Sequence, residues 1–183
     1  MFDSSDRARL LALLREHAVL RGEFVLSSGT RSTVYLDARR VTLSARGSPL
    51  VGALLLDAIG DVDAVAGPTL AADPIVTSVA VRAGLAGRQV DGLIVRKEAK
   101  VHGAGRRIEG PWRDGMTVAI VDDTSTTGAS SLDAARTVAE AGGHVAGIWQ
   151  LIDREQGARE AVEREGYTFW AAFTAGEVLE ERV

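Results

Sequence analysis

Two adjacent acids, Asp122 and Asp123, stand directly before a run of small residues, Thr124 to Gly128. A turn of Ser, Thr and Gly that leads into a helix presents free backbone N–H groups, which bind anions. Carboxylates accept hydrogen bonds from hydroxyl groups and coordinate metal ions. The stretch therefore indicates a ligand with an anionic group at one end and hydroxyls or a metal ion at the other.

A ribose 5-phosphate has this form. The turn would hold the phosphate, and the two acids would accept hydrogen bonds from the 2′- and 3′-hydroxyls. Further donors would be the hydroxyls of Thr124, Ser125, Thr126, Thr127 and Ser130. The stretch is not a P-loop, because the lysine is missing, and it lacks the three spaced glycines of the dinucleotide-binding motif. The alternative interpretation is an ordinary strand–turn–helix junction whose acids are solvated caps.

A second group of chemically active residues lies between positions 96 and 107. This basic segment contains five of the 21 Lys and Arg residues, with only Glu98 opposing them. Its notable residues are Arg96, Lys97, Lys100, His102, Gly103, Gly105, Arg106 and Arg107. Such positive charge can neutralise a polyanionic leaving group, and the glycines would let the segment open and close. The alternative is a solvated basic loop.

The elements that must position these residues follow an alternating pattern. Periodicity predicts helices at 5–19, 44–59, 70–83, 129–141 and 157–165, and strands at 24–26, 33–37, 63–67, 91–95, 117–121, 144–152 and 167–173. Strands that are apolar on both faces and alternate with helices favour a parallel sheet covered on both sides. Ligands of such sheets bind beyond the carboxyl ends of the strands, so we expect the site residues just after strands.

Composition narrows the class of protein. With 183 residues, 46% of them hydrophobic and 25% charged, the chain is expected to form one domain. It has no cysteine for a disulfide or thiolate metal site, no apolar run long enough to span a membrane, and no secretory signal pattern at its start. A net charge of −4 gives no reason to expect nucleic-acid binding. We therefore expect a cytoplasmic protein without a nucleic-acid or membrane partner.

Four stretches resemble a known family. VAIVDDTSTTGAS (118–130) is similar to the phosphoribosyl-pyrophosphate (PRPP) motif of type I phosphoribosyltransferases, and VRKEAKVHGAGRRIEG (95–110) resembles the mobile catalytic loop of orotate phosphoribosyltransferases. FVLSSGTRSTVYLDAR (24–39) resembles the strand–turn–strand that closes over the base, and LIDREQGA (151–158) the strand end that carries an orotate-binding arginine. The resemblance runs from about residue 5 to residue 175.

It implies an α/β type I phosphoribosyltransferase fold. A single domain, 1–183, would hold a central parallel sheet flanked by helices, with a small N-terminal hood mainly from about 1–40. The activity implied is transfer of ribose 5-phosphate from PRPP to orotate in pyrimidine (UMP) biosynthesis, giving orotidine 5′-monophosphate and pyrophosphate. Mg²⁺ would be carried mainly by PRPP and pyrophosphate, and a homodimer would share loop residues between subunits.

The resemblance also assigns roles to residues. The implied catalytic residues are Lys100, Asp122 and Asp123. PRPP would be bound by Arg96, Lys97, Lys100, His102, Asp122, Asp123, Thr124, Ser125, Thr126, Thr127, Gly128, Ala129 and Ser130. Orotate would be bound by Thr126, Arg154, Tyr35 and Leu36, and no residue is expected to be a dedicated metal ligand.

The sequence departs from the family pattern at two places. Many members have Lys where this chain has Ser27, and a Tyr-Lys pair where it has Thr69 and Leu70. Either backbone amides from Thr69 to Ala71 hold the pyrophosphate unaided, or the basic segment contributes more.

Two other functions share the PRPP motif. They are transfer to a purine or another pyrimidine, and a PRPP-sensing regulator that binds nucleic acid.

Overall fold

A mostly parallel sheet forms the centre of the molecule. The computed structural model describes residues 3–25, 29, 31–98 and 107–180, and within them the sheet has six strands in the order β5-β4-β3-β6-β7-β8. All neighbours are parallel except β4 and β5, which are antiparallel. The strands are β3 (Ala64–Pro68), β4 (Asp91–Val95), β5 (Ile108–Glu109), β6 (Thr117–Ser125), β7 (His144–Asp153) and β8 (Phe169–Thr174).

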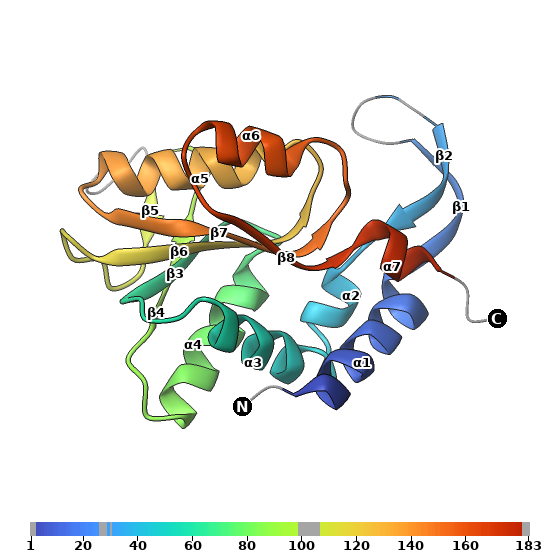
Figure 1. Cartoon of the computed structure of the whole chain (residues 1–183), viewed down its shortest axis with the longest axis horizontal. Helices are drawn as coiled ribbons and strands as arrows, with labels where there is room; N and C mark the ends of the chain where they lie inside the picture. Colours follow the sequence, from blue (N-terminus) through green and yellow to red (C-terminus); the bar gives the residue numbers. More distant parts are fainter. Residues whose placement is uncertain (1–2, 26–28, 30, 99–106, 181–183) are drawn as a thin grey trace.

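Helices cover both faces of this sheet, as Figure 1 shows. One face packs on α5 (Ala129–Glu140) and α6 (Ala158–Arg164), and the other on α3 (Ser48–Ala58) and α4 (Asp73–Leu85). Side chains alternate along a strand, so β6 contributes to the apolar cores on both faces of the sheet. Val118 and Ile120 belong to the core under α5 and α6, and Ala119 and Val121 belong to the core under α3 and α4. Within the described part of the chain, no helix is long and apolar enough to cross a membrane.

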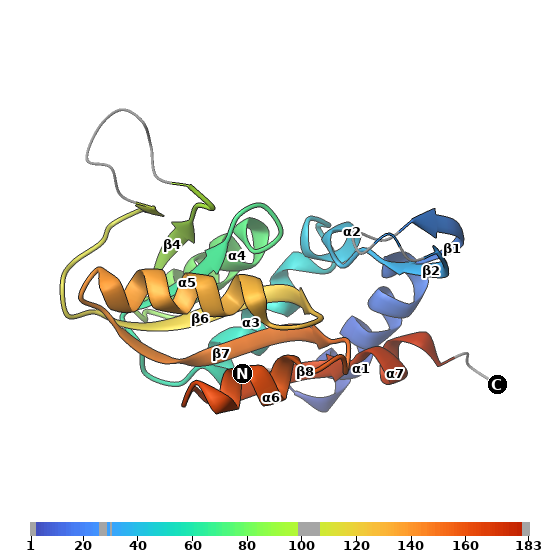
Figure 2. The same ribbon diagram turned by 90° about the horizontal axis from the view of Figure 1, so that it is seen from above.

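We refer to the N-terminal elements of the chain as the hood. They are α1 (Ser4–Leu13), its continuation as the π-helical turn η1 (Leu14–Ala18), the antiparallel strands β1 (Val19–Val25) and β2 (Arg31–Leu36), and α2 (Arg39–Thr42). Buried residues of the hood such as Leu10 and Leu36 belong to the same apolar core as α3 and α4. Figures 1 and 2 both place the β1–β2 pair on the side where β6 and β7 turn into their helices. The hood therefore lies beyond the carboxyl ends of these strands.

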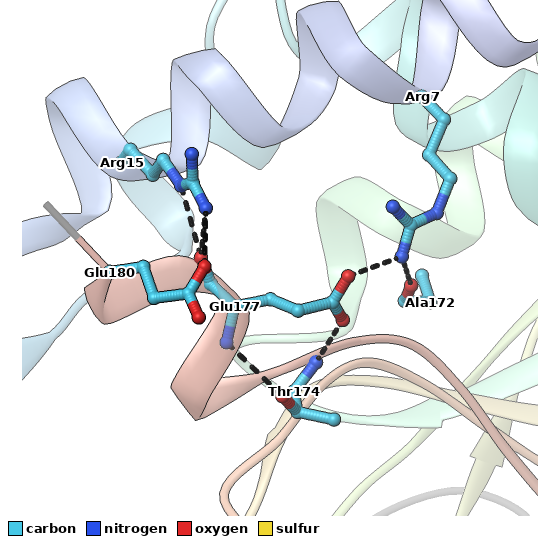
Figure 3. A network of polar contacts seen from close by, with 6 residues as sticks. All are labelled: Arg7, Arg15, Ala172, Thr174, Glu177 and Glu180. Carbon is cyan, nitrogen blue, oxygen red and sulfur yellow. Dashed lines mark hydrogen bonds and ion pairs between the residues drawn. The ribbon is translucent and has the colours of Figure 1, made fainter. Parts of the chain in front are cut away.

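The last helix, α7 (Ala175–Leu179), joins the sheet to the hood. Thr174 and Glu177 form a capping box at its start. Arg7 of α1 donates to the Glu177 carboxylate (2.8 Å) and to the Ala172 carbonyl (2.9 Å), and Arg15 donates twice to the Glu177 carbonyl (3.0 and 2.8 Å). Figure 3 shows these contacts, which attach the hood helix to the end of β8.

The expected α/β class and central parallel sheet are confirmed, whereas several boundaries were wrong. β6 was expected to end at Val121 but runs to Ser125, because its polar end stays paired with β7 up to Asp153. β1 begins at Val19 rather than at Phe24, since pairing with β2 holds a stretch too polar to be predicted as a strand. The short elements α2, β5 and α7 were not predicted.

Candidate active site

The two adjacent acids lie inside β6 and not in the turn after it. Asp122 and Asp123 are only 6% and 7% exposed. Because consecutive strand residues point to opposite faces, the carboxylates face different layers of the molecule. Asp122 contacts Ser131 on the α5 face, and Asp123 interacts electrostatically with Arg39 of the hood. The two carboxylates therefore do not point into the same space.

Asp122 is held by hydrogen bonds within the fold. Its Oδ1 accepts from the backbone N–H of Asp123 (2.9 Å), and its Oδ2 from the Ser131 hydroxyl (3.3 Å). Ser131 Oγ in turn accepts from Nε2 of Gln150 (2.8 Å), a side chain on β7 that is 0% exposed. Burial, reinforced by the nearby Asp123 carboxylate, raises the pKa of Asp122 to about 8. The sequence contained no signal for the roles of Ser131 and Gln150.

Asp123 has a different environment. Its Oδ1 accepts from the N–H (2.6 Å) and the hydroxyl (3.3 Å) of Thr124. Burial raises its pKa, and the Thr124 hydrogen bonds and the Arg39 charge oppose that rise. Arg39 is itself paired with Asp37 (Nε to Oδ1, 2.8 Å). Asp37 and Arg39 end the quoted stretch 24–39, but their link to Asp123 could not be found from sequence, because it depends on the hood folding over the strand.

The turn after β6 has the form of an anion site. Gly128 adopts a left-handed conformation (φ 76°), and a Cβ there would lie 3.3 Å from the carbonyl oxygen of Ala158. Leu132 makes the first bond of the helix, to Gly128, so the N–H groups before it point out of the helix end. The surrounding residues Thr126, Thr127, Ala129 and Ser130 are exposed, whereas Ser125 is buried. The structure thus brings the predicted phosphate-binding residues together at one helix N-terminus.

Arg154 follows β7 at the same edge of the sheet. Its backbone N–H donates to the carbonyl of Ser125 (2.9 Å), which ties it to the end of β6. Its half-buried side chain makes no hydrogen bond or ion pair with any residue that the structure describes. An arginine held by its backbone with an unpaired guanidinium is suited to bind a carboxylate from a ligand.

The other predicted orotate contacts are on the hood. Tyr35 is half-buried, with its ring 5.6 Å from that of Phe24. Leu36 is 6% exposed and belongs to the apolar core. A ligand near β2 would therefore meet Tyr35 more directly than the side chain of Leu36.

The turn between β3 and α4 is a further anion-binding candidate. Thr69 donates its N–H to Val95 (3.0 Å) and its hydroxyl to Asp73 (2.9 Å), which fixes the turn. Within the described residues, no hydrogen bond uses the backbone N–H of Leu70 or Ala71. Of the amides considered from sequence, Thr69 is thus occupied and the next two are available.

The basic segment is described only at its two ends. The backbones of Arg96 and Arg107 pair (2.8 Å), and Arg107 also donates from Nε to the Arg96 carbonyl (2.7 Å) while it forms an ion pair with Asp133 of α5. Nη1 of Arg96 lies 3.6 Å from Oε1 of Glu109, and Lys97 is exposed. The predicted residues Lys100 and His102 lie outside the described residues.

The acids of this region occur singly around the site. Among the residues that the structure describes, no three His, Cys, Asp or Glu side chains are grouped to hold a metal ion. Asp123 lies in β6 and Asp73 at the start of α4, so these two carboxylates come from separate elements. Such a donor set fits Mg²⁺ that arrives with its own phosphate oxygens, because Mg²⁺ is often bound by one or two carboxylates plus substrate phosphates and water.

Similarity to known proteins extends over nearly the whole chain. It is 47% identical over 169 residues to the orotate phosphoribosyltransferase of Corynebacterium glutamicum, covering 91% of this chain and 90% of that protein. It is 44% identical over 177 residues to the orotate phosphoribosyltransferase of Tropheryma whipplei, covering 95% and 83%. No family model matches the sequence.

Solved structures agree with these relatives. The crystal structure of Mycobacterium tuberculosis orotate phosphoribosyltransferase in complex with PRPP superposes with a TM-score of 0.81 at 38% sequence identity, covering 94% of this chain and 98% of that one. A phosphoribosyltransferase from Corynebacterium diphtheriae superposes with a TM-score of 0.83 at 40% identity, covering 95% and 98%. The similarity includes both the sheet and the hood.

Proposed function

Because the chain belongs to the orotate phosphoribosyltransferase family, we propose how its own residues carry out that reaction. The enzyme transfers ribose 5-phosphate from PRPP to orotate, in the synthesis of pyrimidine nucleotides. A bond forms between N1 of orotate and C1 of the ribose as N1 gives up its proton. The bond from C1 to the pyrophosphate oxygen breaks, and pyrophosphate leaves with the bonding electron pair and can take up that proton. The observation that carries the proposal is the backbone hydrogen bond from Arg154 to Ser125, which holds beside the anion-binding turn a guanidinium that has no partner among the described residues.

The 5′-phosphate of PRPP would occupy the turn from Thr126 to Ser130. The exposed N–H groups from Thr126 to the start of α5 and the hydroxyls of Thr127 and Ser130 would donate to its oxygens. The positive end of the helix dipole would add to this binding. Fixing the phosphate would fix the distance from the turn to C1, where the reaction occurs.

The ribose would then lie over the end of β6, under the hood. From the sequence, both Asp122 and Asp123 are expected to accept hydrogen bonds from its hydroxyls. The side chain on the hood face is that of Asp123, which supports Asp123 as the direct contact. A carboxylate there would also favour the positive charge that develops on the sugar ring as pyrophosphate departs.

The leaving pyrophosphate would be stabilised from two sides. The N–H groups of Leu70 and Ala71, which donate to no residue that the structure describes, would bind it from the β3–α4 turn, where the family lysine is absent. The basic segment would contribute the charges of Arg96, Lys97, Lys100 and His102, as the family resemblance implies. Mg²⁺ bound to PRPP oxygens would neutralise part of the negative charge.

Orotate would bind between β7 and the hood. Arg154 would pair with its carboxylate, the Thr126 hydroxyl would hydrogen-bond the ring, and Tyr35 with Leu36 would cover it. The guanidinium is the group that would distinguish orotate from uracil, which lacks the carboxylate.

A second copy of the chain would complete the enzyme. A cavity of about 620 Å³ lies along α2, α3 and α4, and most of its lining is apolar. Its rim includes Leu43, Leu70, Val81 and Leu85, each more than half exposed. Apolar side chains gathered on one surface favour an interface, and Leu70 connects this surface to the pyrophosphate turn. A homodimer would cover this surface. We also propose that the enzyme is located in the cytoplasm.

One assay tests the reaction. The protein is mixed with PRPP, Mg²⁺ and orotate, and the loss of orotate absorbance is followed, with adenine, hypoxanthine and uracil as alternative acceptors. We expect turnover with orotate as the acceptor and none with the other three bases. Turnover of another base, with no conversion of orotate, would favour the purine or pyrimidine alternative. Binding of DNA or RNA at physiological salt, without turnover, would favour the regulator.

A further inference from the structure

The two ends of the basic segment lie side by side at the edge of the sheet. β4 and β5 flank the segment in the sequence, and they pair antiparallel with Val95 opposite Ile108. The N–H of Arg96 donates to the carbonyl of Arg107 (2.8 Å), so the pairing continues to the first and last residues of the segment. The chain therefore leaves the sheet and returns to it at one place, and a group that holds this place holds both ends.

The side chain of Arg107 joins these two ends to a helix. Its Nε donates to the carbonyl of Arg96 (2.7 Å), and its Nη1 donates to Oδ1 of Asp133 in α5 (3.2 Å). Its Nη2 makes a second hydrogen bond, to Oδ2 of the same carboxylate. A guanidinium that meets a carboxylate through two hydrogen bonds has a defined orientation as well as a favourable charge interaction. One side chain thus attaches both ends of the basic segment to α5.

Asp133 lies close to the anion-binding turn. Because α5 begins at Ala129, Asp133 is about one helical turn, or roughly 6 Å along the axis, from the start of the helix. The N–H groups at that start are the ones proposed for the 5′-phosphate of PRPP, and the basic segment is proposed for its pyrophosphate. The ion pair between Arg107 and Asp133 therefore connects the two elements that would bind the two anionic ends of one substrate.

The ion pair is partly exposed, so it restricts position more than it adds stability. The side chains of Arg107 and Asp133 are 25% and 53% exposed. Ion pairs in such surroundings contribute little to the free energy of unfolding, because water and salt screen them. The hydrogen bond from Arg107 lowers the pKa of Asp133, so the carboxylate is charged at neutral pH. We therefore expect loss of the pair to be seen in substrate binding before it is seen in stability.

We propose that Arg107 and Asp133 are positioning residues, which hold the base of the basic segment at a fixed distance from the phosphate-binding turn. These roles rest on the proposed function, because they take both anionic ends of PRPP to be bound where that function places them. With its base attached to α5, the segment brings its charges to the pyrophosphate from a fixed origin, which lowers the cost of orienting them. Arg107 itself is engaged by protein acceptors at Nε, Nη1 and Nη2, so its role requires no contact with the substrate.

A double-mutant cycle tests the pair. Arg107→Gln and Asp133→Asn each remove one charge and leave a polar side chain in place. We expect each to raise the KM for PRPP and the inhibition constant of pyrophosphate about three- to tenfold. The double variant should lose no more than the weaker single variant, because the second substitution removes an interaction that is already absent. Additive losses would contradict the pairing, and a far larger loss in Arg107→Gln than in Asp133→Asn would show that Arg107 contacts the substrate itself.

Inhibition by ribose 5-phosphate separates positioning from a general disturbance of α5. This compound has the 5′-phosphate but no pyrophosphate, so its inhibition constant should stay within about twofold of wild type in all three variants. An equal rise for ribose 5-phosphate and pyrophosphate would overturn the positioning role. Arg136→Gln is the matched control, because Arg136 lies on the same helix and forms its own two-bond pair with Glu165, directly after α6. It should leave both inhibition constants unchanged.

Binding measurements separate the positioning role from the proposed function. If the wild type binds PRPP and pyrophosphate without converting orotate, the acceptor assignment fails, and the Kd values of the variants for pyrophosphate with Mg²⁺ still decide on the pair. If the wild type binds neither, the positioning role falls together with the proposed function. Thermal unfolding shows which variants are folded. Where Arg107→Gln is not, Arg107→Lys replaces it, since lysine keeps the charge and loses the planar fork.

Discussion

Arg7 of the first helix donates a hydrogen bond of 2.8 Å to the carboxylate of Glu177, 170 positions further along the chain, in the last helix. The same carboxylate accepts from the N–H of Thr174 (3.0 Å). One side chain therefore caps α7 and attaches the hood to the sheet. The hydrogen bond joins the two ends of the chain, α1 of the hood and α7 after β8. It therefore stabilises the arrangement in which the hood lies beyond β6 and β7.

Glu177→Ala should lower the free energy of unfolding by about 1–2 kcal/mol, since it removes the capping box and the contact with Arg7. Glu177→Gln should cost less, because an amide oxygen can still accept from Thr174. Burial tends to raise the pKa of Glu177, but hydrogen bonds from Arg7 and Thr174 lower it overall. Its contribution is therefore present at neutral pH and lost as the pH falls below the ordinary value of a glutamate. Urea unfolding measures this, and an equal loss in Glu163→Ala would argue against a specific role.

Arg154→Ala should affect orotate and leave PRPP binding nearly intact. A charge-assisted pair between guanidinium and carboxylate predicts a loss of about 10- to 100-fold in kcat/KM for orotate. Any residual activity with uracil should not fall, because uracil has no carboxylate. Arg154→Lys keeps the charge without the planar fork and should be intermediate. Steady-state kinetics with both acceptors checks this, and equal losses for orotate and uracil would point to a structural role.

Lys100→Ala should lower kcat by on the order of a hundredfold or more, like the removal of other groups that stabilise charge in a transition state. The prediction rests on the family resemblance of the basic segment, since this lysine lies outside the described residues. Turnover at saturating PRPP and orotate is the measurement. Arg164→Ala, on the exposed surface of α6, is the control. A near-normal rate for the lysine variant would remove Lys100 from the mechanism.

Asp122→Asn should change how stability depends on pH. The folded protein keeps a proton on Asp122 up to a pH of about 8, whereas an unfolded chain releases it near 3.8. The folded state thus binds more protons between these values, and wild-type stability falls as the pH rises, by at most about 1.4 kcal/mol per pH unit from this group. Asparagine does not titrate, so the variant should gain stability relative to wild type from pH 4 to 8. Parallel curves in denaturant unfolding would show that Asp122 is ionised throughout.

Val81→Arg should dissociate the proposed dimer. Val81 lines the apolar cavity between α2, α3 and α4, and a buried, unpaired arginine at an interface is costly. Size-exclusion chromatography with light scattering should show a smaller particle than wild type at equal concentration. Arg164→Glu changes charge on the other side of the sheet and should not alter the mass. A wild-type monomer would exclude this interface.

Much of the site could be read from the order of residue types. The run from Asp122 to Ser130 predicts an acid pair followed by an anion-binding turn, because free backbone amides at a helix start depend on local sequence alone. The alternation of apolar strands with helices from position 63 onward is equally local, and it predicted the parallel sheet. The resemblance to the family rested on the residue types and spacing within four short stretches, and these too are local features of the sequence.

Only the tertiary structure decided which partners each of these residues has. Asp122 and Asp123 are equivalent in the sequence, yet pairing of β6 with β7 up to Asp153 extends the strand through both and turns their carboxylates to opposite layers. The partners that then define them, Ser131 and Gln150 for one and Arg39 for the other, come from elements up to 84 positions away in the chain. Strand register and the closing of the hood are long-range events, so no pattern within a window of sequence could reveal them.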